Sequence, residues 1–246
     1  MKDIFEVISK RHSVRSYTGE LPPESFMRDL AARVAESRGD GWRIVLIKSG
    51  IDGKIGSYGI ISNAPAWMVL IADGRDQSAL EAAMAMERLV LQSTAAGVGT
   101  CWVGGTFRIG KLNALLDKNR NEKVLAVVPF GIPKDNKSML EKVMTKLAHS
   151  KTRKPFDSLF SATGDNFGPY REALEAVRLA PSAVNAQPWR AHVDGPKVTF
   201  STATDNSYTM LDMGIALCHF SLVAEQQSLP GHLKIDIALP HIATWQ

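Results

Sequence analysis

Two long segments of the chain, residues 78–96 and 208–228, carry apolar side chains on nearly every side of a helix. A surface helix keeps one polar face, so a helix that is apolar almost all round lies inside a core. The sequence therefore predicts two long buried helices, one in each half of the chain.

Shorter patterns predict other elements. Apolar positions at helical spacing predict a helix over residues 2–10, and a second helix begins near the acidic Glu24, after two prolines, and extends to about Ser37. Runs of apolar and β-branched residues predict strands at 42–48, 67–72 and 123–130.

The two predicted buried helices prompt a comparison of the two halves, which reveals a weak internal repeat. The matching segments are Leu-Ala-Ala-Arg-Val at 30–34 before Trp42 and Leu-Glu-Ala-Val-Arg at 174–178 before Trp189. On the long helices, Glu81 can be laid over Asp212. The tryptophans are 147 residues apart and the helix positions 131, so the second half would lack about 16 residues between strand and helix.

Residues 151–169 contain prolines, glycines and many polar residues, and they are the best candidate for the connection between the halves. We expect residues 1–155 and 156–246 to form two halves that share one sheet and one core, rather than two domains that fold independently.

Composition adds mainly exclusions. Of 246 residues, 45% are apolar and 22% charged, which allows a substantial core without disulfides or metals. The net charge is +4, but the basic residues are scattered, so we expect no nucleic-acid partner, and a small anionic ligand fits this bias equally well. Cys101 and Cys218 lie in apolar stretches and are expected to be free thiols.

The start of the chain shows neither a signal-peptide nor a transit-peptide pattern. The longest apolar run, residues 64–72, is far shorter than the roughly 20 residues that a membrane-spanning helix needs. These features predict a cytoplasmic protein without a membrane partner.

The first candidate site is Arg11-His12-Ser13-Val14-Arg15, directly after the first predicted helix. Guanidinium groups and a hydroxyl suit phosphate oxygens, because such charge-assisted hydrogen bonds contribute about 1.5–3 kcal/mol each. The segment is either a phosphate clamp or a solvated basic turn. Lys151-Thr152-Arg153-Lys154-Pro155 adds positive charge later in the chain, and a solvated connection is its alternative interpretation.

A second candidate lies between Pro181, which ends a helix, and Pro188, which forces an extended approach to the next strand. It contains Ser182, Asn185 and Gln187. Amides carry donors and acceptors that can match the alternating edge of a flavin or a nucleobase. The alternative is an ordinary polar loop from helix to strand.

The third candidate is Gly-Val-Gly-Thr-Cys-Trp-Val-Gly-Gly at 97–105, which either caps the buried helix and turns, or lets the backbone approach a flat cofactor. Trp102 breaks a G-x-G-x-x-G pattern, and Leu112 stands where a phosphate loop needs Ser or Thr. Histidines and cysteines show no zinc spacing. His219, on the second long helix, is expected to be a hydrogen-bonded core residue and not a base.

The joint occurrence of these clusters resembles the nitroreductase family of FMN enzymes over nearly the whole chain. The resemblance implies that Arg-x-Ser-x-Arg at 11–15 binds the FMN phosphate, and that the Pro-Ser-x-x-Asn-x-Gln loop and the glycine turn lie beside the ring. The implied cofactor contacts are Arg11, His12, Ser13, Arg15, Val103, Gly104, Gly105, Arg153, Pro181, Ser182, Ala183, Asn185 and Gln187. It implies no catalytic side chain and no metal, because flavin N5 carries the chemistry.

The order of these motifs departs from the ordinary family. There the Pro-Ser-x-x-Asn loop follows the Arg-x-Ser motif by a few tens of residues, but here residues 36–41 hold Glu-Ser-Arg-Gly-Asp-Gly in that place. The second half has the loop but holds Asn-Phe-Gly-Pro at 166–169 instead of Arg-x-Ser. The chain thus resembles a branch in which two copies fused and each kept what the other lost.

The resemblance implies an α+β fold with a largely antiparallel sheet and an internal pseudo-dimer, so that one chain holds one FMN and can act as a monomer. The implied function is oxidation of NADH or NADPH through the flavin, by ping-pong hydride transfer to a nitroaromatic, a quinone or a similar small-molecule acceptor. One alternative is a flavin-binding protein that stores or senses FMN without turnover. Another is a degenerate interaction protein that has lost the cofactor.

Overall fold

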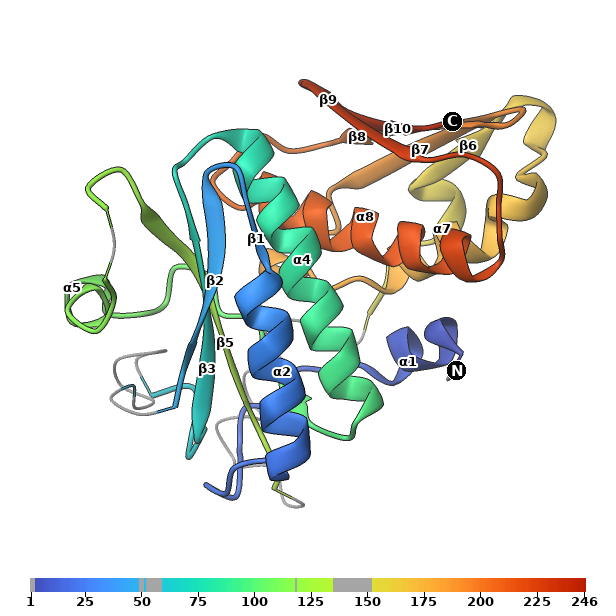
Figure 1. The fold of residues 1–246 in the computed structure, drawn as a ribbon. Helices are drawn as coiled ribbons and strands as arrows, with labels where there is room; N and C mark the ends of the chain where they lie inside the picture. Colours follow the sequence, from blue (N-terminus) through green and yellow to red (C-terminus); the bar gives the residue numbers. More distant parts are fainter. Residues whose placement is uncertain (1–2, 49–50, 52–58, 118, 135–151) are drawn as a thin grey trace.

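The structure, a computed structural model, describes residues 3–48, 51, 59–117, 119–134 and 152–246. Two five-stranded sheets lie on either side of two long helices, α4 (Asp76–Ala95) and α8 (Thr209–Gln226), which pack against each other (Figure 1). The expected α+β class with long buried helices is confirmed.

The first sheet has the strand order β1-β2-β3-β5-β4, and every pair in it is antiparallel. Its strands are β1 (Arg38–Gly39), β2 (Trp42–Ile47), β3 (Ala66–Ala72), β4 (Gly99–Thr100) and β5 (Lys123–Gly131). The helices α2 (Glu24–Glu36) and α4 pack on one face, and α5 (Ile109–Asn113) packs with residues 14–17 on the other. Every residue of β3 is buried because both faces of this strand are covered.

The second sheet has the strand order β6-β7-β8-β10-β9. Its strands are β6 (Phe160–Ala162), β7 (Trp189–Asp194), β8 (Lys197–Thr202), β9 (Leu233–Ala238) and β10 (His241–Trp245). β6 runs parallel to β7, and the other pairs are antiparallel. The helices α1 (Ile4–Lys10), α7 (Arg171–Leu179) and α8 share its core, so the N-terminal helix packs with the second half of the chain.

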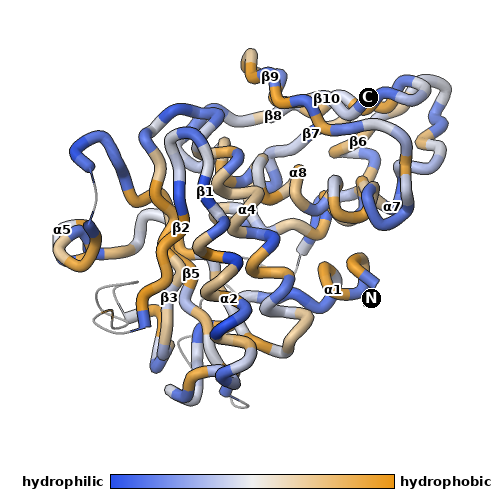
Figure 2. Tube along the Cα trace, viewed as in Figure 1, coloured by the Kyte–Doolittle hydropathy of each residue, from blue (hydrophilic) through white to orange (hydrophobic). Residues whose placement is uncertain are grey.

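Four short 3₁₀-helices complete the described elements: η1 (Phe156–Ser158), η2 (Thr163–Asp165), η3 (Gly168–Tyr170) and η4 (Ala183–Asn185). Figure 2 shows hydrophilic and hydrophobic stretches alternating along α2, as expected of a helix with one face on a core.

The helix α8 is buried at 15 of its 18 residues, which confirms the expectation from its pattern. It approaches α4 so closely that a Cβ on Gly214 would lie 2.4 Å from the Leu80 carbonyl oxygen. Glycine is therefore needed at this crossing, and the pair α4–α8 forms the seam between the two sheets.

The two sheets correspond except at the edge strands β1 and β6: β1 follows α2 and runs antiparallel to β2, whereas β6 precedes α7 and runs parallel to β7. In each, a helix precedes an antiparallel pair, β2-β3 or β7-β8, and a long helix follows the pair. Eighteen residues separate β2 from β3, whereas two separate β7 from β8. This difference of 16 residues equals the mismatch between the tryptophan and helix offsets in the sequence repeat.

One expectation is wrong. The halves do not share one sheet, because each long helix packs on its own sheet and on the other helix, which keeps the sheets apart; the buried apolar residues form three clusters. The candidate connection at 151–169 is structured over part of its described residues: it contains η1, η2 and the strand β6, which pairs with β7 of the second sheet. Residue 151 lies outside the described residues.

Cys101 and Cys218 are buried free thiols, as expected. A search of the described residues finds no helix that is long and apolar enough to cross a membrane.

Candidate functional site

Residues 11–17 are fixed along the edge of the first sheet. Ser13 forms a parallel bridge with Thr100, and the Val14 N–H donates to the Thr100 carbonyl at 2.8 Å. The buried Tyr17 hydroxyl donates to the Val14 carbonyl at 2.6 Å. The basic segment therefore runs beside the glycine-containing segment, so two of the three predicted clusters are neighbours.

Arg11 carries a guanidinium with an unused donor. Within the part of the chain that the structure describes, its Nε atom is buried and has no hydrogen-bond partner. Burial lowers the pKa of the Arg11 guanidinium below its ordinary value, and the Glu87 carboxylate opposes that shift. The group still stays charged, since arginine is not deprotonated in proteins. A desolvated cation with a donor to spare is stabilised by an anion.

Arg153 brings a second guanidinium to the same region. Its pKa is lowered, first by burial and then by the positive charge of Arg11. It donates to Asn185 Oδ1 at 3.4 Å and to the Leu179 carbonyl at 3.1 Å. Because the charge of Arg11 disfavours the charge of Arg153, an anion bound near both would be stabilised. The structure thus gathers residues from three distant parts of the sequence.

The loop over residues 181–187 is held by its own amides. The Gln187 side chain is buried; its Oε1 accepts from the Lys154 N–H at 2.8 Å and its Nε2 donates to the Asn185 carbonyl at 3.3 Å. The Asn185 Nδ2 donates to the Thr152 carbonyl at 3.0 Å. The amides that the sequence offered to a flavin edge therefore fasten the loop to the segment around Arg153.

The same loop has an unusual backbone. Val184, Asn185 and Gln187 have φ angles of 47°, 58° and 48°. The left-handed region costs a non-glycine residue about 1–3 kcal/mol, and a β-branched residue suits it least. Val184 is also 89% exposed despite its apolar side chain. Strained backbone of this kind concentrates at functional sites.

The glycine turn receives an aromatic side chain from the second half. Gly105 has a φ of +73°, and a Cβ there would lie 2.3 Å from the Tyr208 hydroxyl oxygen. A Cβ on Gly104 would lie 3.1 Å from the Tyr208 ring. Val103, just before, exchanges two backbone hydrogen bonds of 2.9 Å with Val127 of β5. The turn needs glycine because Tyr208, the N-cap residue of α8, packs on it.

Asp212 lies one turn further along α8 and contacts the loop. It is 5% exposed, and its Oδ1 accepts from the Ala183 N–H at 2.9 Å. Burial raises the pKa of Asp212 to about 7, although this hydrogen bond favours the carboxylate. The start of α8 therefore contacts both the glycine turn, through Tyr208, and the 181–187 loop, through Asp212.

Tyr208 and Asp212 were not among the predicted site residues. The available signal for Asp212 was a single carboxylate within the largely apolar residues 210–224. For Tyr208 the local pattern held no signal, since its role depends on what packs against the start of α8.

The remaining predicted residues lie at the margins of this region. His12 is exposed, and its Nδ1 lies 3.1 Å from the Lys10 carbonyl oxygen. Arg15 is partly buried, and its charge helps to lower the pKa of Arg11. The Ser182 hydroxyl oxygen accepts from the backbone N–H of the buried glutamine of the loop at 2.9 Å.

A buried network joins α4 to α8 near Arg11. His219 and Glu87 are both fully buried, and His219 Nε2 lies 2.9 Å from Glu87 Oε1. The other carboxylate oxygen accepts from Trp102 Nε1 at 2.6 Å. The expectation that His219 is a hydrogen-bonded core residue is confirmed.

A groove of about 830 Å³ lies elsewhere, between α1, α2, α4 and α8. None of the predicted cofactor contacts lines it. Concave volume alone would point to this groove, but the desolvated charges, the strained loop and the glycine turn all lie in the other region.

The fold is that of a nitroreductase. A crystal structure described as "a putative nitroreductase" from Thermotoga maritima superposes with a TM-score of 0.68 at 22% identity, covering 99% of this chain and 93% of that one. The profile of the family described as "Putative TM nitroreductase" matches residues 3–224. The chain belongs to this nitroreductase family.

Two further relatives align with part of the chain. A "Putative NADH dehydrogenase/NAD(P)H nitroreductase" from Archaeoglobus fulgidus is 28% identical over 159 residues, which is 57% of this chain and 91% of that protein. A nitroreductase with bound FMN from Bacteroides fragilis superposes with a TM-score of 0.47 at 16% identity, over 56% of this chain and 92% of that one.

Proposed function

We propose that this chain binds one FMN between residues 11–15 and the 181–187 loop, and uses it to oxidise NADH or NADPH with a nitroaromatic, a quinone or a similar small molecule as acceptor. Membership of a nitroreductase family supports the oxidoreductase class. The single observation that carries the proposal is the buried, unpartnered Nε of the Arg11 guanidinium among the described residues, in a region that also holds Arg153.

The donor set fits the phosphate of FMN. A phosphate ester carries up to two negative charges and three acceptor oxygens, which match two guanidinium groups and the hydroxyl of Ser13 in the same segment. Binding an anion there would offset the repulsion between Arg11 and Arg153 and would use the spare donor of Arg11. His12 and Arg15 add polar and positive groups at the edge of this cluster.

The second half of the chain fits the ring side. Gly104 and Gly105 carry no side chains of their own, Tyr208 packs on this turn, and the loop presents the exposed Val184. When bound, flavin supplies the two-electron chemistry, accepting hydride from the nicotinamide and passing it to the acceptor. The side chains named here bind and orient the cofactor, and none has to act as acid or base.

We further propose that residues 1–155 and 156–246 derive from two fused nitroreductase-like units. The corresponding strand orders and the single connection that holds the 16-residue difference support this. Both sides of the site come from one chain, so a monomer can be active without a partner subunit.

Anaerobic titration tests the function. Purified chain is loaded with FMN, the flavin per chain is measured, and NADH or NADPH is added without oxygen. We expect one FMN per chain, bleaching of its absorbance, and recovery of the colour with a nitroaromatic. Bound flavin that neither nicotinamide reduces would indicate a storage or sensing role. A chain that takes up no FMN would overturn the proposal, and two FMN per chain would overturn the single site.

A further inference from the structure

We propose that Asp212 is a positioning residue of the 181–187 loop: by accepting the Ala183 N–H it holds the loop in its left-handed conformation. The position of the loop follows from the structure alone. Only the consequence for cofactor binding rests on the proposed function.

The side chain of Asp212 is committed to this one contact. It is 5% exposed, and within the described residues it accepts a single hydrogen bond, from the Ala183 N–H at 2.9 Å. Burying a carboxyl group without a cationic partner is costly, whereas an apolar residue would suit the core around α8. The hydrogen bond to the Ala183 N–H is therefore what Asp212 provides and an aliphatic residue would not.

The hydrogen bond acts where the loop is most strained. Ala183 directly precedes Val184 and Asn185, which have φ angles of 47° and 58°. Left-handed non-glycine residues persist only where the surroundings determine them. The far end of the loop is fastened by Gln187 to the Lys154 N–H, and Asp212 fastens the near end to α8. Val184 lies between these two tethers.

The protonation state of Asp212 should affect the amide proton of Ala183, which donates to its carboxyl group. Burial raises the pKa of Asp212 to about 7. Its causes are burial and the opposing Ala183 hydrogen bond, so no other ionisable side chain causes the shift, whether on α8 (Cys218, His219, Glu225), on α4 (Asp76, Glu81, Glu87, Arg88) or near the loop (Arg153, Lys154, Arg190, Tyr208). Because a carboxylate is a stronger acceptor than a carboxylic acid, the Ala183 hydrogen bond should strengthen as the pH rises through about 7.

NMR of the full chain without flavin tests the contact directly. We expect the amide proton of Ala183 to titrate with a midpoint near pH 7. Asp212→Asn keeps an acceptor oxygen and should abolish the titration while the loop stays ordered. Asp212→Ala should speed amide exchange at Ala183 and Val184 about tenfold or more, since it removes the tether. Asp205→Asn, on the exposed turn before α8, is the control and should change neither.

FMN binding by the same variants separates this proposal from the proposed function. We expect Asp212→Ala to raise the Kd for FMN about tenfold and Asp212→Asn to change it less than threefold. Faster amide exchange with unchanged FMN affinity would keep the positioning role and overturn the ring side of the flavin site. If Asp212→Ala fails to fold, amide exchange in the wild type decides: an Ala183 N–H that exchanges as fast as an amide without a hydrogen bond would overturn the proposal.

Discussion

The connection from α2 to β2 and the connection from α7 to β7 occupy the same place in the two sheets, but they are built differently. In the first, β1 pairs back on β2, and Arg75 forms ion pairs with Asp40 at 2.9 Å and with Asp73 at 2.6 Å. In the second, three non-glycine residues adopt left-handed conformations and Val184 stands exposed. The first connection is closed by a short strand and charge pairs, whereas the second keeps a strained loop in a fixed shape.

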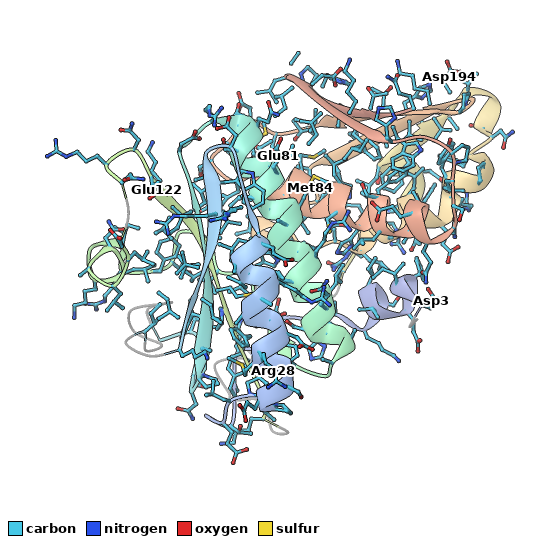
Figure 3. The ribbon with its side chains drawn as sticks, viewed as in Figure 1. Asp3, Arg28, Glu81, Met84, Glu122 and Asp194 are labelled. Carbon is cyan, nitrogen blue, oxygen red and sulfur yellow. The ribbon has the colours of Figure 1, made fainter. Side chains whose placement is uncertain are left out.

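The long helices α4 and α8 each carry a carboxylate near the corresponding connection, but the two carboxylates bind different groups. Glu81 lies as far beyond the start of β3 as Asp212 lies beyond the start of β8. Glu81, near the N-terminal end of α4 beside the β1–β2 turn (Figure 3), accepts from Trp42 Nε1 at 3.1 Å. Asp212 instead accepts from the loop. Trp189, the counterpart of Trp42, has a buried Nε1 without a hydrogen-bond partner among the described residues.

Glu81 and Asp212 thus occupy corresponding positions in the two halves, but their carboxyl groups accept hydrogen bonds from different partners. In the first half, Glu81 satisfies the strand tryptophan, and the turn beside it needs no further tether. In the second half, Asp212 accepts from the loop instead, and Trp189 Nε1 has no hydrogen-bond partner among the described residues. This exchange supports the proposal that only one of the two equivalent places binds a cofactor.

The largest expected effect is on how the free energy of unfolding changes with pH. The pKa of Asp212 is about 7 in the folded chain and near its ordinary value of 3.8 when unfolded, so the folded state binds the proton more tightly. The contribution of Asp212 to stability is therefore fully present below about pH 4 and is lost as the pH rises to about 7, a loss of about 4 kcal/mol at most. Asp212→Asn should remove this slope in urea unfolding measured from pH 4 to 8.

Glu81→Gln is the matched control from the first half. It should leave the slope in place, because Asp212 remains. A stability difference between the wild type and Asp212→Asn that stays constant from pH 4 to 7 would contradict the difference between the two carboxylates.

The next effect concerns the arginines of the two regions, Arg11 in the candidate site and Arg75 in the first connection. Arg11→Ala removes one charge-assisted interaction with the phosphate, which is worth about 2 kcal/mol, so the Kd for FMN should rise about 30-fold by fluorescence titration. Arg75→Ala, which breaks the ion pairs of the closed connection, should leave the Kd unchanged. Equal losses in both variants would mean that the two regions are alike in binding.

Hydrophobic periodicity was enough to predict the long helices and the central strands, because their burial requires an apolar pattern. The three polar clusters were visible as well, and the structure brings Arg11, Arg153 and Asn185 together. The separation into two sheets could not be predicted, since periodicity does not say which distant strands pair. Tyr208 and Asp212 could not be predicted as site residues, because their contacts depend on what packs against the start of α8.

A smaller effect is expected at two glycines with positive φ. A Cβ on Gly105 would meet the Tyr208 hydroxyl, and a Cβ on Gly41, at φ +78°, would lie 2.2 Å from Asp73 Oδ2. Each change to Ala should destabilise the chain by about 1–2 kcal/mol in thermal unfolding. Only Gly105→Ala should also weaken FMN binding. Adding Tyr208→Ala to Gly105→Ala should recover part of the stability, and no recovery would show that the tyrosine does not require the glycine.

The smallest effect tests whether the backbone of the 181–187 loop is strained. Val184→Gly relieves a left-handed β-branched residue, which is worth about 1–3 kcal/mol, and loses about 1 kcal/mol because glycine is freer in the unfolded chain. Since Val184 is 89% exposed, little burial is lost, and we expect a net gain of about 1 kcal/mol, or about 2–4 °C in Tm. Ala183→Gly, at a residue without positive φ, should instead lower stability by about 0.5–1 kcal/mol. If both glycines destabilise equally, the loop stores no backbone strain, and the contrast with the closed connection reduces to its ion pairs.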